Sequence, residues 1–331
     1  MSALEIFSFS FNAVAPMLLL IAAGYILKSV KFANEDFFKT GNRICFRLAL
    51  PALLFKNVYD IESLSDLDLS AMLYSALMTL FLFLLGYIVT LFVKDRRQKG
   101  VLWQCTFRSN FALIGLVLAE AIGGSEGLQL AAVLTASTIP LFNILAVIAL
   151  SVFIPGKDGK KMSIGSILLG IVKNPLIIAV FSGFVVLFIR PHVSFSIESD
   201  IPFLYDAIEM LAELASPLAL IVLGGQFSFS AVKGLKKQII AGTVLRTMVV
   251  PVIGLGCAWL LDYLGVFTLT PAHYAAYTAL FGSPIAISSG VMASEMGNDE
   301  ILAGQLIVWT SIVSMGTVFL IISALKALGL I

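Results

Sequence analysis

Two stretches of this chain, Arg108-Ser109-Asn110-Phe111-Ala112-Leu113-Ile114-Gly115 and Phe281-Gly282-Ser283-Pro284-Ile285-Ala286-Ile287-Ser288-Ser289-Gly290, place small and polar residues inside otherwise apolar segments. The hydrocarbon core of a membrane contains no water that could hydrogen-bond to unpaired backbone N–H and C=O groups. Irregular backbone at that depth is therefore tolerated mainly where it lines a solvated cavity. Paired breaks at corresponding positions in two halves of a chain are typical of a transporter's binding site. The two stretches therefore predict a binding site where they meet.

The composition indicates a chain that crosses a membrane several times. Of its 331 residues, 59% are hydrophobic and only 12% are charged, whereas soluble domains are nearer half apolar and a quarter charged. A spanning helix needs about 20 mostly apolar residues. Ten segments meet this need, which predicts an all-α polytopic membrane protein: 7–28, 36–57, 68–93, 101–119, 128–153, 164–189, 203–225, 238–261, 273–293 and 303–328.

Several functional classes have no support in the sequence. No basic stripe with interleaved aromatic residues indicates nucleic-acid binding. Cys45, Cys105 and Cys257 all fall inside predicted spans, so we expect neither a disulfide framework nor a metal site. The first basic residue, Lys28, follows the first span, which argues against a signal peptide. No catalytic set or cofactor signature is evident, and we expect no enzyme activity.

Lysine and arginine concentrate in alternate connections between the spans. The first, third, fifth and seventh connections hold Lys28, Lys31, Lys39, Lys94, Arg96, Arg97, Lys99, Lys157, Lys160, Lys161, Lys233, Lys236 and Lys237. The opposite side holds Lys56, Arg190 and Lys326. The positive-inside rule places the first group in the cytoplasm. We therefore expect a multi-pass protein of the cell (inner or plasma) membrane with both termini on the non-cytoplasmic side.

Local matches indicate that residues 1–153 and 164–331 are two repeats of five spans. Pro16 and Gly24 have the same separation as Pro175 and Gly183. The stretch 51–55 resembles 217–221, and 118–120 resembles 293–295. A five-span unit crosses the membrane an odd number of times, so its copy must be inverted. The two breaks then fall in the fourth and ninth spans, 101–119 and 273–293.

The ordered motifs of the chain resemble those of the auxin efflux carrier family, which includes plant auxin exporters and bacterial malate and malonate carriers. The likeness rests on Leu50–Phe55, Asn110–Gly115, Lys173–Ile177, Ser216–Gly225 and Ser283–Gly297. One departure is Val117, where the family usually has a proline after the first break. A break resting on Asn110 and Gly115 is therefore expected to be milder than the second.

The resemblance also implies a fold similar to that of bile-acid sodium symporters and sodium–proton antiporters. In that fold the first, second, sixth and seventh spans form a scaffold. The third to fifth and eighth to tenth spans form a mobile transport unit that carries the crossed, broken helices.

Polar residues at the breaks are the candidate substrate ligands. Asn110, beside Ser109, either binds a substrate carboxylate or only satisfies freed backbone groups. We expect Pro284 to break the second of these helices and Gly115 to break the first. Ser283, Ser288 and Ser289 flank the N-terminus of the half-helix after Pro284, and a helix N-terminus suits an anion. The alternative for these serines is bonding back to carbonyls of their own helix.

Charged and amide side chains near the breaks extend this candidate set. Arg108 either attracts a carboxylate or reaches the cytoplasmic face or Glu120. Asn143 is either a site residue, as the resemblance implies, or a contact between helices. Arg43, Arg47, Lys173 and Arg246 are expected to be structural or interfacial.

These observations predict a secondary active transporter of small organic anions such as malate, malonate or auxin-like acids. No nucleotide-binding motif is evident, so a gradient must supply the energy, with Na⁺ or H⁺ as a possible coupling ion and no other cofactor. The expected partners are the substrate and the lipid bilayer, with a homodimer as a further possibility. The rival interpretation is a membrane sensor or channel that retains the carrier fold.

The charge pattern predicts which loops face the cytoplasm. Single cysteines replacing Asp158 and Leu235 should react with a membrane-impermeant reagent only from the cytoplasmic side, and those replacing Leu64 and Ser199 only from the other side. The opposite pattern at any two of these positions would contradict the predicted orientation.

Overall fold

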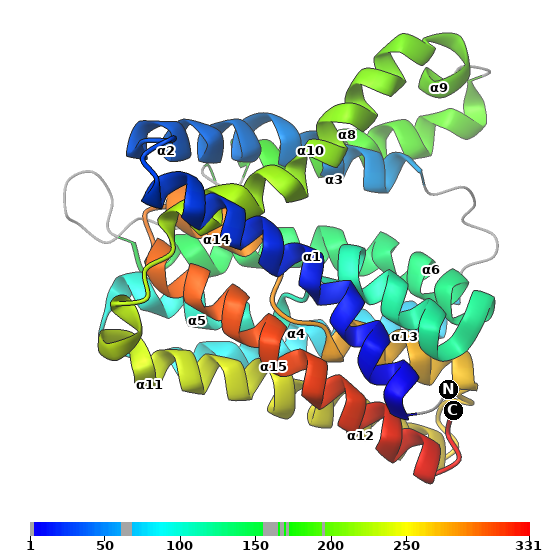
Figure 1. The fold of residues 1–331 in the computed structure, drawn as a ribbon. Helices are drawn as coiled ribbons and strands as arrows, with labels where there is room; N and C mark the ends of the chain where they lie inside the picture. Colours follow the sequence, from blue (N-terminus) through cyan, green and yellow to red (C-terminus); the bar gives the residue numbers. More distant parts are fainter. Residues whose placement is uncertain (1–2, 61–67, 155–164, 166–168, 170–171, 194–195) are drawn as a thin grey trace.

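The computed structural model describes residues 3–60, 68–154, 172–193 and 196–331, together with residues 165 and 169 (Figure 1). Most of the expected linker at 154–163 and the start of the second predicted repeat at 164 lie outside these residues. Every element within the described ranges is a helix. This agrees with the all-α class predicted from the composition.

The first half of the chain begins with long helices in the predicted places. Helix α1 (Ala3–Ser29) is followed by a continuous path of α2 (Glu35–Ile44), the π-turn η1 (Cys45–Ala49) and α3 (Leu50–Tyr59). Next come α4 (Leu69–Leu91), α5 (Arg96–Phe107), the π-turn η2 (Phe111–Gly115) and α6 (Leu116–Ser151). Within α6, Gly124 takes a positive φ of 63°, which turns the chain between two helical parts.

The second half repeats several of these features. Its elements are α8 (Pro175–Ile189), the 3₁₀ turn η3 (Arg190–His192), α9 (Ile197–Asp200), α10 (Pro202–Gln226), α11 (Ala231–Val244), the π-turn η4 (Leu245–Val249), α12 (Val250–Tyr263), α13 (Pro271–Gly282), α14 (Ser288–Glu295) and α15 (Glu300–Ala327). Both η1 and η4 lie just before a proline, Pro51 or Pro251. Because proline lacks an N–H and crowds the preceding turn, the helix widens there.

The hydropathy of the helices identifies a polytopic membrane protein. Among the described residues, five helical stretches are long and apolar enough to cross a membrane: 69–91, 111–151, 202–226, 231–263 and 300–327. Helix α4 leaves Leu73, Leu77, Leu84 and Ile88 exposed along one side. An apolar stripe at helical spacing on the outside of the protein is suited to contact with lipid.

The helices gather into two groups that meet at the centre (Figure 1). Helices α2, α3, α8 and α10 lie together at the top of the view, whereas α5, α11, α12 and α15 lie below them. Glycines allow close approach within the upper group and to α1. Gly24 of α1 lies against the backbone of Ile221 in α10, and Gly224 of α10 lies against the backbone of Ile21 in α1. In the same way, Gly183 of α8 lies against Val58 of α3.

The contact between α1 and α10 should be sensitive to a single methyl group. A Cβ at Gly224 would overlap the carbonyl oxygen of Ile21, so Gly224→Ala is expected to destabilise the protein by about 1–3 kcal/mol. The measurement is the thermal unfolding midpoint in detergent. Gly256→Ala in α12 is the matched control, since nothing lies within 4 Å of its added Cβ. Equal midpoints for the two variants would contradict the proposed close packing.

Candidate functional site

The two sequence breaks meet through their backbones. Helix α5 ends at Phe107 and α13 ends at Gly282, and the residue after each end, Arg108 or Ser283, is extended. Ser109 pairs in antiparallel fashion with Ile285, and the N–H of Asn110 donates to the carbonyl of Pro284 over 2.8 Å. Each break thus supplies backbone partners to the other, as buried irregular backbone requires.

The first break leaves residues 108–110 outside helices and continues into the π-turn η2, whereas the second leaves residues 283–287 outside helices. The milder first break expected from Val117 stays a prediction. Arg108 is extended, Ser109 pairs with Ile285 and Asn110 has φ −80° and ψ 50°, whereas Gly115, at the end of the π-turn η2, has helical angles of φ −64° and ψ −46°. The assignment of Gly115 to the break stays a prediction. A side chain at Gly115 would strike Phe111 and press on the carbonyl of Ala279 at 3.3 Å, so this glycine serves close packing against α13.

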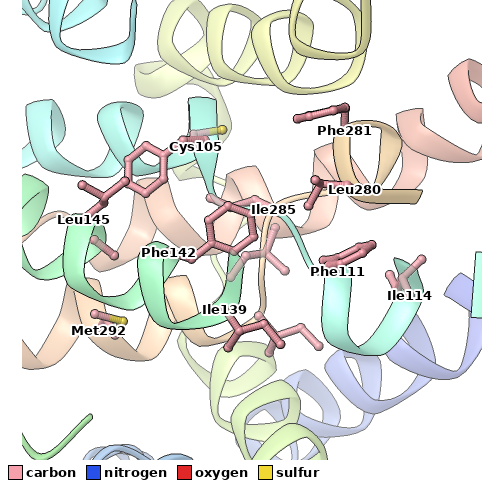
Figure 2. Close-up of a cluster of buried hydrophobic side chains, with 14 of the residues drawn as sticks. Cys105, Phe111, Ile114, Ile139, Phe142, Leu145, Leu280, Phe281, Ile285 and Met292 are labelled. Atoms are coloured by element: carbon pink, nitrogen blue, oxygen red, sulfur yellow. The ribbon is translucent and has the colours of Figure 1, made fainter. Parts of the chain in front are cut away.

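Four half-helix ends converge at the crossing. Helices α5 and α13 end there and present their C-terminal carbonyl groups. Two helical segments begin there and present their N-terminal N–H groups: one is η2 with α6, and the other is α14. Helix N-termini carry partial positive charge and helix C-termini partial negative charge. Apolar side chains surround this point, among them Phe111, Phe142, Leu280 and Ile285 (Figure 2). The charges therefore act in a medium of low polarity, where they are stronger than in water.

Arg108 lies at the crossing with only 3% of its surface exposed. Its Nη2 donates to Oδ1 of Asn143 over 2.9 Å and to Oγ of Ser288 over 2.8 Å. Its Nη1 points at the sulfur of Met292. The arginine therefore does not use Glu120, and the ion pairs found among the described residues do not include it. A buried guanidinium held only by neutral oxygens is costly and suits an anionic ligand.

Asn110 and Ser109 add polar groups beside this arginine. Asn110 is 4% exposed, and within the described part of the chain its Nδ2 has no hydrogen-bond partner. The hydroxyl of Ser109 is likewise buried without a protein partner. Asn143 uses its own Nδ2 on the carbonyl of Ile139 over 2.8 Å, which turns its oxygen toward Arg108. Buried donors without a partner are rare and call for an explanation.

A central cavity of about 60 Å³ brings most of the predicted residues together. It is lined by Arg108, Ser109, Asn110, Asn143 and Ser288 on the side of the crossing. The opposite wall comes from α3, α8 and α10 and consists of Leu50, Leu53, Leu54, Asn57, Leu176, Ala215, Ser216 and Ala219. The lining combines polar groups of the crossing with a largely apolar wall, as small-molecule sites do.

The other predicted serines and the proline lie outside the lining of this cavity. The hydroxyl of Ser283 donates to the carbonyl of Ala279 within its own helix, and Pro284 offers its carbonyl to Asn110. Ser289 is buried and its carbonyl accepts from Gln104. These three residues shape the crossing, whereas Asn57 and Ser216 line the cavity and were not selected from the sequence. The Ser216-Pro217 sequence inside an apolar span could have indicated Ser216 as a candidate.

Arg246, which the sequence analysis expected to be structural or interfacial, lies at the crossing. It is 1% exposed and donates to four backbone carbonyls, those of Ser283, Phe281, Leu280 and Thr106, over 2.9, 3.0, 3.2 and 3.4 Å. All four belong to the carbonyl ends of α13 and α5. The signal in the sequence was an arginine inside an apolar span, which usually has a partner within the protein.

Two further hollows flank the central cavity. One, the acidic hollow of about 880 Å³, is lined by Asp60, Asp68, Glu126 and His273 and shares Asn57, Ala112 and Ile139 with the central cavity. Burial raises the pKa of Asp68, but hydrogen bonds from Ser70, Ala71 and His273 outweigh it and hold that pKa below its usual range. Asp68 therefore stays ionised at neutral pH.

The other hollow, of about 640 Å³, lies at the opposite end and has mixed charge. Its lining includes Lys28, Lys39, Arg43, Glu295 and Glu300 and has no residue in common with the central cavity. Asn42 of α2, 2% exposed, donates to Oε1 of Glu295 at the end of α14 over 2.8 Å. The central cavity thus adjoins the acidic hollow, with which it shares lining residues, and shares none with the mixed-charge hollow.

Comparison with known proteins agrees with this architecture. Residues 9–322 match a family described as membrane transport protein. The chain is also 26% identical over 316 residues to an uncharacterized transporter of Methanothermobacter thermautotrophicus, a match that covers 94% of this chain and 96% of that protein. Since the family match extends over nearly the whole chain, the protein belongs to the auxin efflux carrier family of membrane transport proteins.

Proposed function

We propose that this transporter is a secondary carrier of small organic anions, which bind at the crossing through a carboxylate group. The observation that carries the proposal is the buried guanidinium of Arg108, which lines the central cavity and has only neutral hydrogen-bond acceptors. A carboxylate there would gain a charge-assisted hydrogen bond from Arg108 and the attraction of two helix N-termini. The free Nδ2 of Asn110 would supply a further donor.

The walls of the cavity favour an anion with a single carboxylate and an apolar body. Among the described residues that line the cavity, Arg108 is the one cation, and the wall opposite is largely leucine and alanine. Lys56, the nearest cation in sequence to this wall, is paired with Asp60 and Glu209. A second carboxylate would be placed against leucine side chains, where an unpaired charge is strongly disfavoured.

The proposed transport cycle alternates access between the two flanking hollows. We assign the ten predicted spans to two inverted repeats, residues 1–153 and 164–331, with α5 to η2 and α13 to α14 as the broken spans. Equivalent glycine contacts support the repeat, because Gly24 packs on α10 as Gly183 packs on α3. The scaffold would comprise the first, second, sixth and seventh spans, and the transport unit the remaining spans with the crossing.

The charge pattern supports a cytoplasmic position for the mixed-charge hollow. Lys28 and Lys39 lie in a connection that the positive-inside rule places there. The described conformation would then be open to the outside, and both termini would lie on the outer face of the cell membrane. The Asn42–Glu295 hydrogen bond closes the inner side, and inward opening requires this bond to break.

Three six-carbon compounds test the substrate chemistry. Hexanoate should raise the unfolding temperature of the purified protein and should be transported into vesicles. Adipate, with a second carboxylate, and hexanamide, with no charge, should bind about tenfold more weakly or worse, because an unpaired charge or a lost charge-assisted bond each cost more than about 1.4 kcal/mol. In Arg108→Gln, the preference for hexanoate over hexanamide should disappear.

Each outcome of this series has a separate meaning. Equal binding of hexanoate and hexanamide by the wild-type protein would contradict an anion site at Arg108. Tighter binding of adipate than of hexanoate would keep the anion site and refute the single-carboxylate preference. Transport of cations alone would refute the organic-anion proposal as a whole.

Asn110 should matter through its amide group. Asn110→Ala is expected to weaken apparent affinity for the anion about ten- to hundredfold, since a hydrogen bond to a charged group is worth about 1.5–3 kcal/mol. Asn110→Asp should be worse, because it adds a negative charge beside the substrate in a medium of low polarity. Ser289→Ala is the control, since Ser289 does not line the cavity. Wild-type uptake of labelled hexanoate by Asn110→Asp would exclude binding at this residue.

A further inference from the structure

The carbonyl side of the crossing has the features of a cation site. Helices α5 and α13 end there with partial negative charge. In carriers with broken helices, unwound carbonyls and half-helix C-termini of this kind coordinate the coupling cation. The carbonyls of Thr106, Leu280, Phe281 and Ser283 all point to one place, which the guanidinium of Arg246 occupies.

Arg246 is placed there by its own helical segment. It lies in the π-turn η4, which widens before Pro251 and leaves the arginine almost fully buried. All three guanidinium nitrogens donate to carbonyls of the two half-helices. The described ion pairs do not include Arg246, so its charge is balanced by carbonyl dipoles. A guanidinium remains charged at neutral pH.

The site of Arg246 is separate from the proposed substrate site. Arg246 is absent from the lining of the central cavity, whereas Arg108 is part of it. Arg246 contacts carbonyl ends of half-helices, and Arg108 contacts Ser288, the first residue of α14. The two arginines thus serve opposite poles of the same crossing.

We propose that Arg246 is a tethered cation that stands in the position of a transported coupling cation, so that the crossing is complete without bound Na⁺. Its role is that of a positioning residue, which holds the ends of α5 and α13 together while the half-helix N-termini face the substrate. The part of this inference that concerns transport rests on the proposed function. The part that concerns cation binding does not, because it is measurable on the protein alone.

The first test measures thermal unfolding of the purified protein in sodium, choline and millimolar guanidinium salts of equal ionic strength. The wild-type midpoint should be the same in all three. Arg246→Ala should unfold at a lower temperature in choline and recover part of the loss with Na⁺ or guanidinium, since the freed carbonyls can bind a small cation. Arg47→Ala is the matched control, because Arg47 also lies in a π-turn before a proline but is exposed.

The second test measures initial rates of hexanoate uptake into vesicles. Wild-type uptake should be unchanged when choline replaces sodium. Arg246→Ala in choline should lose about ten- to hundredfold of the rate, by analogy with the loss of charged hydrogen bonds, and should regain it with Na⁺ or guanidinium. Arg246→Lys, which keeps the charge, should need no added cation.

Several results would overturn the proposal. One is a dependence of the wild-type unfolding midpoint or uptake rate on Na⁺. Another is an Arg246→Ala variant whose midpoint and uptake rate do not change when Na⁺ or guanidinium is added. If Arg246→Ala does not fold in any of the salts, Arg246→Gln decides, because it keeps hydrogen-bond donors without the charge. If Arg246→Gln has the midpoint and uptake rate of the wild type in choline, Arg246 is only a structural hydrogen-bond donor. If Arg246→Gln has a lower midpoint and uptake rate in choline than Arg246→Lys, the tethered cation is supported. If no carboxylate is bound or transported, the proposed function fails and the unfolding experiment still decides this inference.

Discussion

The satisfaction of freed backbone groups at membrane depth is the constraint on which this structure depends. Each unpaired peptide group in hydrocarbon costs several kcal/mol, and two broken helices leave many of them at one point. The breaks solve part of the problem for each other, since Asn110 donates to Pro284 and Ser109 pairs with Ile285. Arg246 satisfies the carbonyl ends. What remains is a set of N–H ends near a cavity, which is the electrostatic basis of the proposed anion site.

The two buried arginines differ in how far the protein itself balances their charge. Arg246 donates to four carbonyls that carry the negative ends of half-helices, and its charge is therefore largely compensated. Arg108 has two neutral side-chain oxygens and a sulfur beside it. Neutral acceptors compensate a desolvated charge less well than a carboxylate does. Both arginines are buried, so burial does not distinguish them. The weaker compensation of its charge indicates that Arg108 is the arginine that would bind an anion.

Local chemistry made the helices and the breaks predictable, but not the direction of every side chain. Polar and small residues at 108–110 and 283–287 identified the irregular backbone directly. The role of Gly115 could not be predicted in the same way, because a helical glycine that admits a neighbour resembles one that ends a helix. Arg47 and Arg246 both precede a proline within an apolar span, yet one is exposed and the other buried. Only packing against the rest of the fold separates them, and this information is not contained in a local pattern.

The same constraint limits how such a carrier can move. Separation of Ser109 from Ile285, or of Arg246 from the carbonyls that it binds, would return several backbone groups to hydrocarbon without partners. By contrast, the Asn42–Glu295 contact is a single hydrogen bond at the edge of a hollow, worth about 1.5–3 kcal/mol. The proposed cycle should therefore keep the crossing and the helix of Arg246 together as one body and exchange contacts at its boundary with α2, α3 and α10. The substrate would then be carried with the crossing, because the ligands that we assign to it belong to that body.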